Sequence, residues 1–214
     1  MAHRHIAMIS GIALLMLLVQ APAPAQRGKF GNAPQAKSVR LGSNVGFTLL
    51  GDDLTKSSDN YRVGVMGTLD FLYLFHPQFG AGLFAGLGTM SSSFGGQTAS
   101  TFYGWYGTQF EGRFIWSRGA IVPFVFLRLG GLTHKPQFVT NGNTVEGETE
   151  TIFTYGGGVG MEILMYRGRK PLYLRLTYGS NLTSSDELDN IVSGDQRDGF
   201  SYLTVGVSYY FGRR

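Results

Sequence analysis

From Ser38 onward, apolar and polar residues alternate along the chain with a period of two. This period is typical of β-strands, in which successive side chains point to opposite faces. In the first such segment, one face carries Val39, Leu41, Val45, Phe47 and Leu49, and the other carries Arg40, Gly42, Asn44, Gly46 and Thr48. The pattern predicts about eight strands of roughly ten residues or more, which matches the ~9–11 residues of a tilted strand that crosses a lipid bilayer.

The connections between these strands alternate in length. Short turns are expected at 76–77, 117–119 and 167–170, and long polar loops at 51–60, 91–101, 134–150 and 183–199. An antiparallel membrane barrel has this asymmetry, with short periplasmic turns and longer outer loops. We therefore predict an all-β fold, an eight-stranded antiparallel up-and-down transmembrane β-barrel with both ends on the periplasmic side.

The N-terminal 25 residues have the three parts of an export signal. A short basic stretch with Arg4 precedes an apolar run from Ile6 to Val19, and the small residues 23–25 follow. A membrane anchor is the alternative, but the run is too short for a spanning helix of ~20 residues. We expect a cleaved signal peptide at 1–25, a flexible periplasmic segment at 26–37 and the barrel at 38–214.

The composition excludes several other classes of protein. Charged residues make up 15% of the chain, against ~25% in ordinary globular proteins. The chain has no cysteine, which excludes disulfide scaffolds, thiol nucleophiles and thiolate metal sites. The apolar content is too high for a disordered chain.

The acidic residues avoid the apolar faces of the predicted strands. Of 14 acidic residues, eleven lie in the four long loops, and the other three are Asp70, Glu111 and Glu162 on polar strand faces. A carboxylate that pointed into lipid would be penalised by desolvation. The apolar faces are therefore expected to contact lipid.

The basic residues have the opposite distribution. The long loops hold three basic residues against eleven acidic ones, a net charge of −8, whereas short turns and chain ends are basic. The formal charge of +4 for the whole chain thus describes the periplasmic end and the lumen. The net positive charge therefore does not indicate nucleic-acid binding, because the long loops are acidic.

Charged residues on the inward faces are expected to meet in the lumen. Five arginines share those faces with the three carboxylates, namely Arg40, Arg62, Arg113, Arg128 and Arg175. Counted back from the short turns, Asp70, Glu111, Arg113, Glu162 and Arg175 lie at similar depth; the expected lumen cluster comprises these five and Arg128. An eight-stranded barrel is just wide enough for side chains to fill, which favours a salt-bridge plug. A watery passage past loosely spaced charges, beside inward glycines such as Gly156, Gly158 and Gly160, is the alternative.

The fourth long loop is the most acidic segment. Its carboxylates, which are candidates for binding a hard divalent cation, are Asp186, Glu187, Asp189, Asp195 and Asp198. Their spacing differs from the twelve-residue helical Ca²⁺ loop. Diffuse attraction of cations that bridge to anionic glycolipid phosphates, or simple solvation of the loop, are the alternatives. We predict no defined metal site and no cofactor.

The last strand resembles the C-terminal assembly signal of bacterial outer-membrane proteins. Thr204, Gly206, Tyr209 and Phe211 fill its four places, and the chain departs from it by continuing through 212–214. As a pattern over residues 38–211, the chain resembles the small eight-stranded outer-membrane barrels, the opacity-protein and OmpA-like class. The resemblance implies insertion by the barrel-assembly machinery, and the expected localisation is the bacterial outer membrane, with its lipid and glycolipid. It does not imply one activity.

Motifs for catalysis are weak. Gly80, Gly82 and Ala85 match a dinucleotide fingerprint as text, but no helix follows them. His134 at the start of the third long loop could serve a lipid-modifying enzyme, although no local motif of such enzymes surrounds it. We predict a monomeric, non-enzymatic barrel for envelope structure or surface interaction through acidic outer loops. A narrow porin or small-solute channel is the second candidate.

Overall fold

The computed structural model describes residues 35–50, 60–62, 64–94, 97–140, 143–166, 171–184 and 199–212. The expected signal peptide 1–25, most of the segment 26–37, the basic turn 167–170 and the five carboxylates of the fourth loop lie outside these residues. The elements are β1 (Ser38–Leu50), β2 (Asn60–Arg62), β3 (Gly64–His76), β4 (Phe79–Phe94), β5 (Gln97–Arg113), the 3₁₀ turn η1 (Ser117–Gly119), β6 (Ile121–Thr140), β7 (Asn143–Glu146), β8 (Glu150–Tyr166), β9 (Leu172–Thr183) and β10 (Gly199–Phe211).

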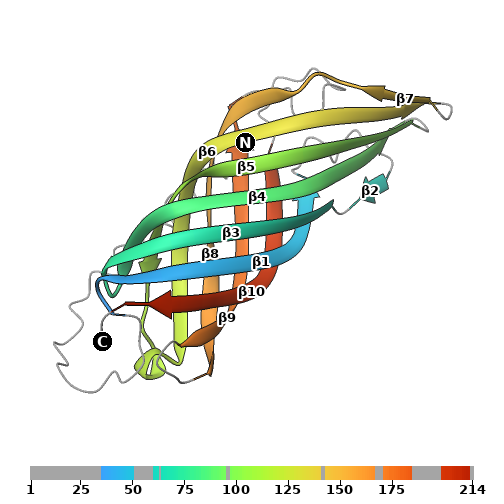
Figure 1. The fold of residues 1–214 in the computed structure, drawn as a ribbon. Helices are drawn as coiled ribbons and strands as arrows, with labels where there is room; N and C mark the ends of the chain where they lie inside the picture. The colour runs from blue at the N-terminus through green and yellow to red at the C-terminus, as the bar shows by residue number, and fades with distance from the viewer. Residues whose placement is uncertain are drawn as a thin grey trace, which may run out of the picture.

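The long strands form one closed antiparallel sheet (Figure 1). Each pairs with the next long strand along the chain, and β1 pairs with β10, so that Val39 lies opposite Phe211 at the closing seam. The short strands β2 and β7 are additions, paired with β4 and β6. The prediction of an eight-stranded antiparallel up-and-down barrel is confirmed. Among the described residues, no helix is long and apolar enough to span a membrane.

Two of the expected long loops are largely strand. Strand β4 runs on to Phe94 and pairs with β5 from Gln97, and β6 continues to Thr140 and pairs with β7. Residues 91–101 are rich in serine and threonine and residues 134–150 include three threonines, and β-branched threonine favours strands. Their polar composition resembles that of a loop because neither face has to be apolar. The loop predictions for 91–101 and 134–150 are therefore wrong over most of their length.

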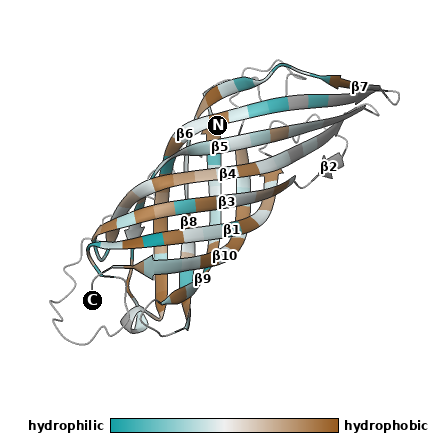
Figure 2. Ribbon diagram, viewed as in Figure 1, coloured by the Kyte–Doolittle hydropathy of each residue, from teal (hydrophilic) through white to brown (hydrophobic). Residues whose placement is uncertain are grey.

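The two faces of the barrel wall differ sharply in character. Val45 and Leu69 on the outside are each 63% exposed, whereas the side chain of Glu162 on the inside is fully buried. Hydrophobic and hydrophilic residues alternate along strands such as β1 and β3 (Figure 2). The alternation read from the sequence thus corresponds to an apolar outside and a largely polar inside, the reverse of a water-soluble protein.

Candidate functional site: the lumen

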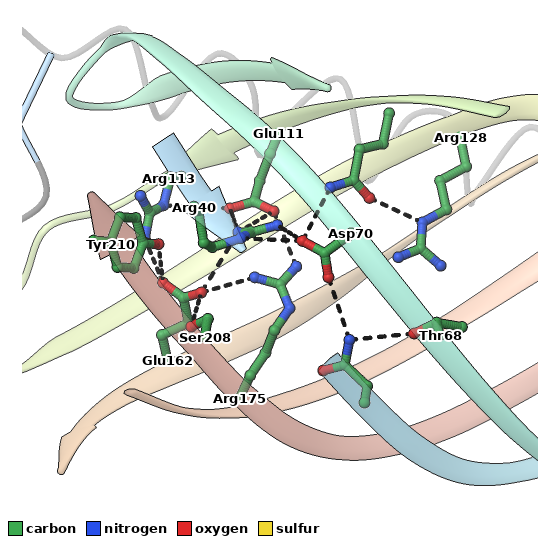
Figure 3. Close-up of polar contacts among 12 residues, drawn as sticks. Arg40, Thr68, Asp70, Glu111, Arg113, Arg128, Glu162, Arg175, Ser208 and Tyr210 are labelled. Atoms are coloured by element: carbon green, nitrogen blue, oxygen red, sulfur yellow. Dashed lines mark hydrogen bonds and ion pairs between the residues drawn. The ribbon is translucent and has the colours of Figure 1, made fainter. Parts of the chain in front are cut away.

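Arg40 lies at the centre of a group of buried charges (Figure 3). Its Nη1 is 2.7 Å from Oε1 of Glu111 and 3.4 Å from Oε1 of Glu162, and its Nη2 is 2.5 Å from Oδ1 of Asp70. Strands β1, β3, β5 and β8 supply these four side chains, each at an inward position of the period-two pattern. One guanidinium therefore joins carboxylates from three other strands.

Two further arginines complete this group, hereafter the ion-pair cluster. Arg175 of β9 donates from Nη1 to Glu162 at 2.8 Å and from Nη2 to Glu111 at 3.0 Å. Arg113 of β5 pairs with Glu162 and lies 3.3 Å from Glu111. Ser208 donates a hydrogen bond of 2.7 Å to Glu162. The members of the cluster are Arg40, Asp70, Glu111, Arg113, Glu162 and Arg175.

The charges of the ion-pair cluster balance, with three arginines against three carboxylates. Their side chains are at most 1% exposed. Buried charges at such sites are tolerated only when they are paired and hydrogen-bonded. Every charge in the cluster is paired through the contacts above, and the Tyr210 hydroxyl also donates to Glu162, although Nε and Nη1 of Arg113 and Nε of Arg175 have no hydrogen-bond acceptor among the described residues.

Five of these six residues belong to the lumen cluster predicted from the sequence. Arg128, the sixth residue of that predicted cluster, lies to one side (Figure 3), and its Nε donates to Gln109 and its Nη1 to the Tyr202 hydroxyl. Arg40 was counted among the inward arginines but left out of the cluster. Arg40 is the third residue of β1, and this end of β1 pairs with the end of β3 beside the short turn at 76–77. That position indicates the same depth in the lumen as the other cluster residues.

An apolar layer covers the ion-pair cluster toward the short turns. It consists of Leu72, Leu74, Val122, Tyr173 and Tyr210, with Leu164 packed against it. The Tyr173 hydroxyl donates a hydrogen bond of 3.0 Å to the carbonyl oxygen of Gly119 in η1, which ties the layer to that turn. Leu72, Leu74 and Val122 were not predicted to face the lumen, because strict alternation assigns polar residues to it.

A second apolar layer lies toward the opposite end. It contains the rings of Phe84, Tyr103, Trp105, Phe124, Phe126, Phe200 and Tyr202, with Met66, Leu132 and Ile152. The rings of Trp105 and Tyr202 meet edge to face with centroids 5.3 Å apart. Phe200 lies 5.7 Å from Trp105 in a similar arrangement. These rings come from opposite walls, so the layer spans the lumen.

Inward glycines make room for these large side chains. Phe126 lies opposite Gly158 and Tyr202 lies opposite Gly179 on the neighbouring strands. A Cβ atom at Gly158 would come 2.1 Å from the carbonyl oxygen of Tyr178 and 2.7 Å from Cζ of Phe126, and one at Gly179 would come 2.5 Å from Cζ of Tyr202. The glycine run at 156–160 therefore leaves space that aromatic rings from the next strands occupy.

Replacing Gly158 with valine is expected to lower the free energy of unfolding by ~1–3 kcal/mol, the usual cost of overpacking. Gly67→Val is the matched control, because a Cβ at this outward glycine has only one neighbour within 4 Å, the Asn44 carbonyl oxygen at 3.9 Å. Urea unfolding in lipid vesicles measures both. Equal stability of the two variants would contradict the close approach of Gly158 to the backbone of Tyr178 and Gly179 and to the Phe126 ring.

His134 lies within β6 rather than at the start of a loop, so its expected position was wrong. It faces the lumen and is 1% exposed, opposite Tyr103 on β5 and Glu150 on β8. A histidine in this position does not face the lipid. Among the described residues, no group of three or more histidine and acidic side chains could hold a metal ion.

The four residues of the proposed assembly signal divide between the two faces of β10. Thr204 is buried on the lumen side with Gly206, whereas Tyr209 and Phe211 lie on the outward positions. The rings of Tyr209 and Phe211 meet edge to face at 4.6 Å. Gly212 then has a φ of 143°, and a Cβ there would lie 2.7 Å from Cα of Ser38. The residue after the last aromatic is therefore one that favours glycine.

Comparison with solved structures identifies the fold of the barrel. Neisserial surface protein A aligns with a TM-score of 0.55 over 81% of this chain and 97% of its own, at 12% identity. The chain has the fold of the small eight-stranded outer-membrane β-barrels. No protein-family model and no curated protein sequence matches it.

Two other outer-membrane barrels align less closely. Ail of Yersinia pestis, in complex with the heparin analogue sucrose octasulfate, gives a TM-score of 0.49 at 11% identity, over 83% of this chain and 100% of its own. OprG of Pseudomonas aeruginosa gives 0.48 at 11% identity, over 85% and 99%. At these identities the likeness extends to the fold and not to an activity. In an outer-membrane barrel, the apolar outside described above is the surface that faces hydrocarbon.

Proposed function

We propose that this chain is a non-enzymatic protein of the bacterial outer membrane whose lumen is closed, and that it serves envelope structure or surface interaction. The observation that carries the proposal is the ion-pair cluster, whose six side chains lie across the lumen and are at most 1% exposed. An aqueous pore would leave such charges wet. The apolar layers on both sides of the cluster add to the barrier.

The strand lengths support a membrane location. Strand β1 has 13 residues, which at ~3.3 Å per residue and a tilt of ~45° gives a height of about 30 Å, the thickness of the hydrocarbon core. Strand β6 has 20 residues and is longer than a crossing requires. The end opposite the short turns is accordingly proposed to be the outer one, where the acidic loops would meet glycolipid phosphates and their bridging cations.

We also propose that residues 1–25 are a signal peptide that is cleaved after export, that 26–37 are a flexible segment, and that the barrel comprises 38–214. The barrel is proposed to be inserted by the barrel-assembly machinery and to be monomeric. The inward position of His134 argues against a lipid-modifying reaction, because the acyl chains and the imidazole would lie on opposite sides of the wall.

Refolded protein in planar lipid bilayers is expected to produce no stable single-channel conductance, because no continuous water path crosses the ion-pair cluster. A variant in which Arg40, Glu111 and Glu162 are replaced together by alanine loses the centre of the ion-pair cluster but keeps both apolar layers, so any conductance it gains measures the share of the barrier that the cluster provides. Stable openings of the unmodified protein would overturn the closed lumen and favour the narrow channel.

A further inference from the structure

Arg128 differs from the other described inward arginines in its surroundings. It is 3% exposed, and among the described residues no carboxylate lies within ion-pair distance of it. Its charge is additional to the balanced ion-pair cluster. A buried cation without a carboxylate partner needs another source of stabilisation.

Four aromatic rings provide that stabilisation. The guanidinium carbon of Arg128 lies 4.7 Å from the ring centroid of Phe84, 4.9 Å from those of Trp105 and Phe126, and 5.8 Å from that of Tyr202. A cation within about 6 Å of a ring centroid is attracted by the negative face of the ring, and more strongly when both are desolvated. We call these four residues, together with Gln109, the Arg128 cage.

Two oxygen atoms fix the orientation of the guanidinium in the cage. Gln109 Oε1 accepts a hydrogen bond of 3.1 Å from Nε, and the Tyr202 hydroxyl accepts one of 3.2 Å from Nη1. Gln109 is itself held by a contact of 3.4 Å from its Nε2 to Asp70 of the ion-pair cluster. Neutral acceptors combined with ring faces are suited to a planar organic cation and provide no site for an anion.

The cage is built by several strands and does not depend on Arg128 for its own geometry. Phe84 and Trp105 pack edge to face at 4.7 Å, and Trp105 and Tyr202 do so at 5.3 Å. Phe126 and Tyr202 occupy the space left by Gly158 and Gly179. Gly156 lies opposite Arg128 on β8. The walls thus remain in place when only the arginine side chain is shortened.

We propose that the Arg128 cage is a binding site for guanidinium-type cations, which the protein fills with its own Arg128 side chain as a tethered ligand. The tether gives the arginine a high effective concentration, so the unmodified protein leaves no room for a free cation. When the side chain is removed, a free guanidinium compound of the same shape should take its place. This proposal concerns the cage alone and is independent of whether the lumen conducts.

The test uses the Arg128→Ala variant of the full barrel in detergent micelles, with methylguanidinium chloride at millimolar concentrations as the probe. We expect a saturable rise in the Tm of the variant, about 3–6 °C at ten times the Kd, and no rise for the unmodified protein. Urea, which is planar but neutral, should produce no saturable rise. The Arg128→Ala/Trp105→Leu double variant, which lacks the largest ring, should lose most of the response.

Equal responses of the variant and the unmodified protein, or no response of the variant, would overturn the proposal. If Arg128→Ala does not refold by itself, the measurement becomes its refolding yield with and without methylguanidinium. A gain in yield that urea does not reproduce would support the cage, and an unchanged yield would overturn it.

Discussion

Replacing Arg40 with methionine is expected to lower the free energy of unfolding by about 3–5 kcal/mol, the range seen when one partner of a buried ion pair is removed. Arg40 contacts Asp70, Glu111 and Glu162 with a guanidinium that is fully buried. Without it, three carboxylates share two arginines and one buried negative charge has no counterpart. Methionine keeps much of the volume, so the loss measures charge rather than a cavity.

The matched control for this prediction is Lys135→Met. Lys135 pairs with Glu146, but the two side chains are 42% and 55% exposed, and exposed pairs of this kind contribute ~0–1 kcal/mol. Urea unfolding in lipid vesicles compares both variants with the unmodified protein. If Arg40→Met costs no more than Lys135→Met, water reaches the ion-pair cluster and the proposed closure of the lumen is wrong.

The barrel could be predicted from the sequence because each wall residue has only two possible directions. Residues that point outward to lipid are apolar and residues that point into the lumen are mostly polar, so the alternation of Leu69 with Asp70 can be recognised in the sequence. The same argument placed Glu111 and Glu162 on the inside. Depth within the lumen was harder to infer, because it depends on the stagger between strands, which the pattern does not encode.

The stagger between strands also decides which charged side chains meet in the lumen. The register places Gln109 opposite Arg128 and Glu162 opposite Arg175. Arg175 therefore joins the ion-pair cluster, whereas Arg128, which also faces the lumen, lies among the aromatic rings. The inward rings were missed for another reason. Trp105 and Tyr202 lie at positions that alternation reserves for polar residues, and only their glycine partners on neighbouring strands, Gly86 and Gly179, indicate that large side chains fit there.

Replacing Leu69 with arginine is expected to destabilise the barrel in a lipid bilayer by about 2–4 kcal/mol, the cost of placing arginine on the lipid face near the bilayer midplane. Leu69 is the sixth of the 13 residues of β3 and is 63% exposed on the outside of the barrel. On a water-soluble barrel the same change would stay within ~0.5 kcal/mol, as surface substitutions do. The variant therefore distinguishes hydrocarbon from water as the solvent of the outer wall.

Val145→Arg provides the internal reference for this comparison. Val145 is 59% exposed, close to the value for Leu69, but it lies in β7, which pairs with the far end of β6 beyond the residues that pair with β8. An arginine there is expected to leave the free energy of unfolding within ~0.5 kcal/mol of the unmodified protein. Both variants should be refolded into the same vesicles and unfolded with urea. Because hydrophobicity and exposure are similar at the two sites, only the depth in the membrane separates them, and equal effects would mean that the outer wall at Leu69 does not face hydrocarbon.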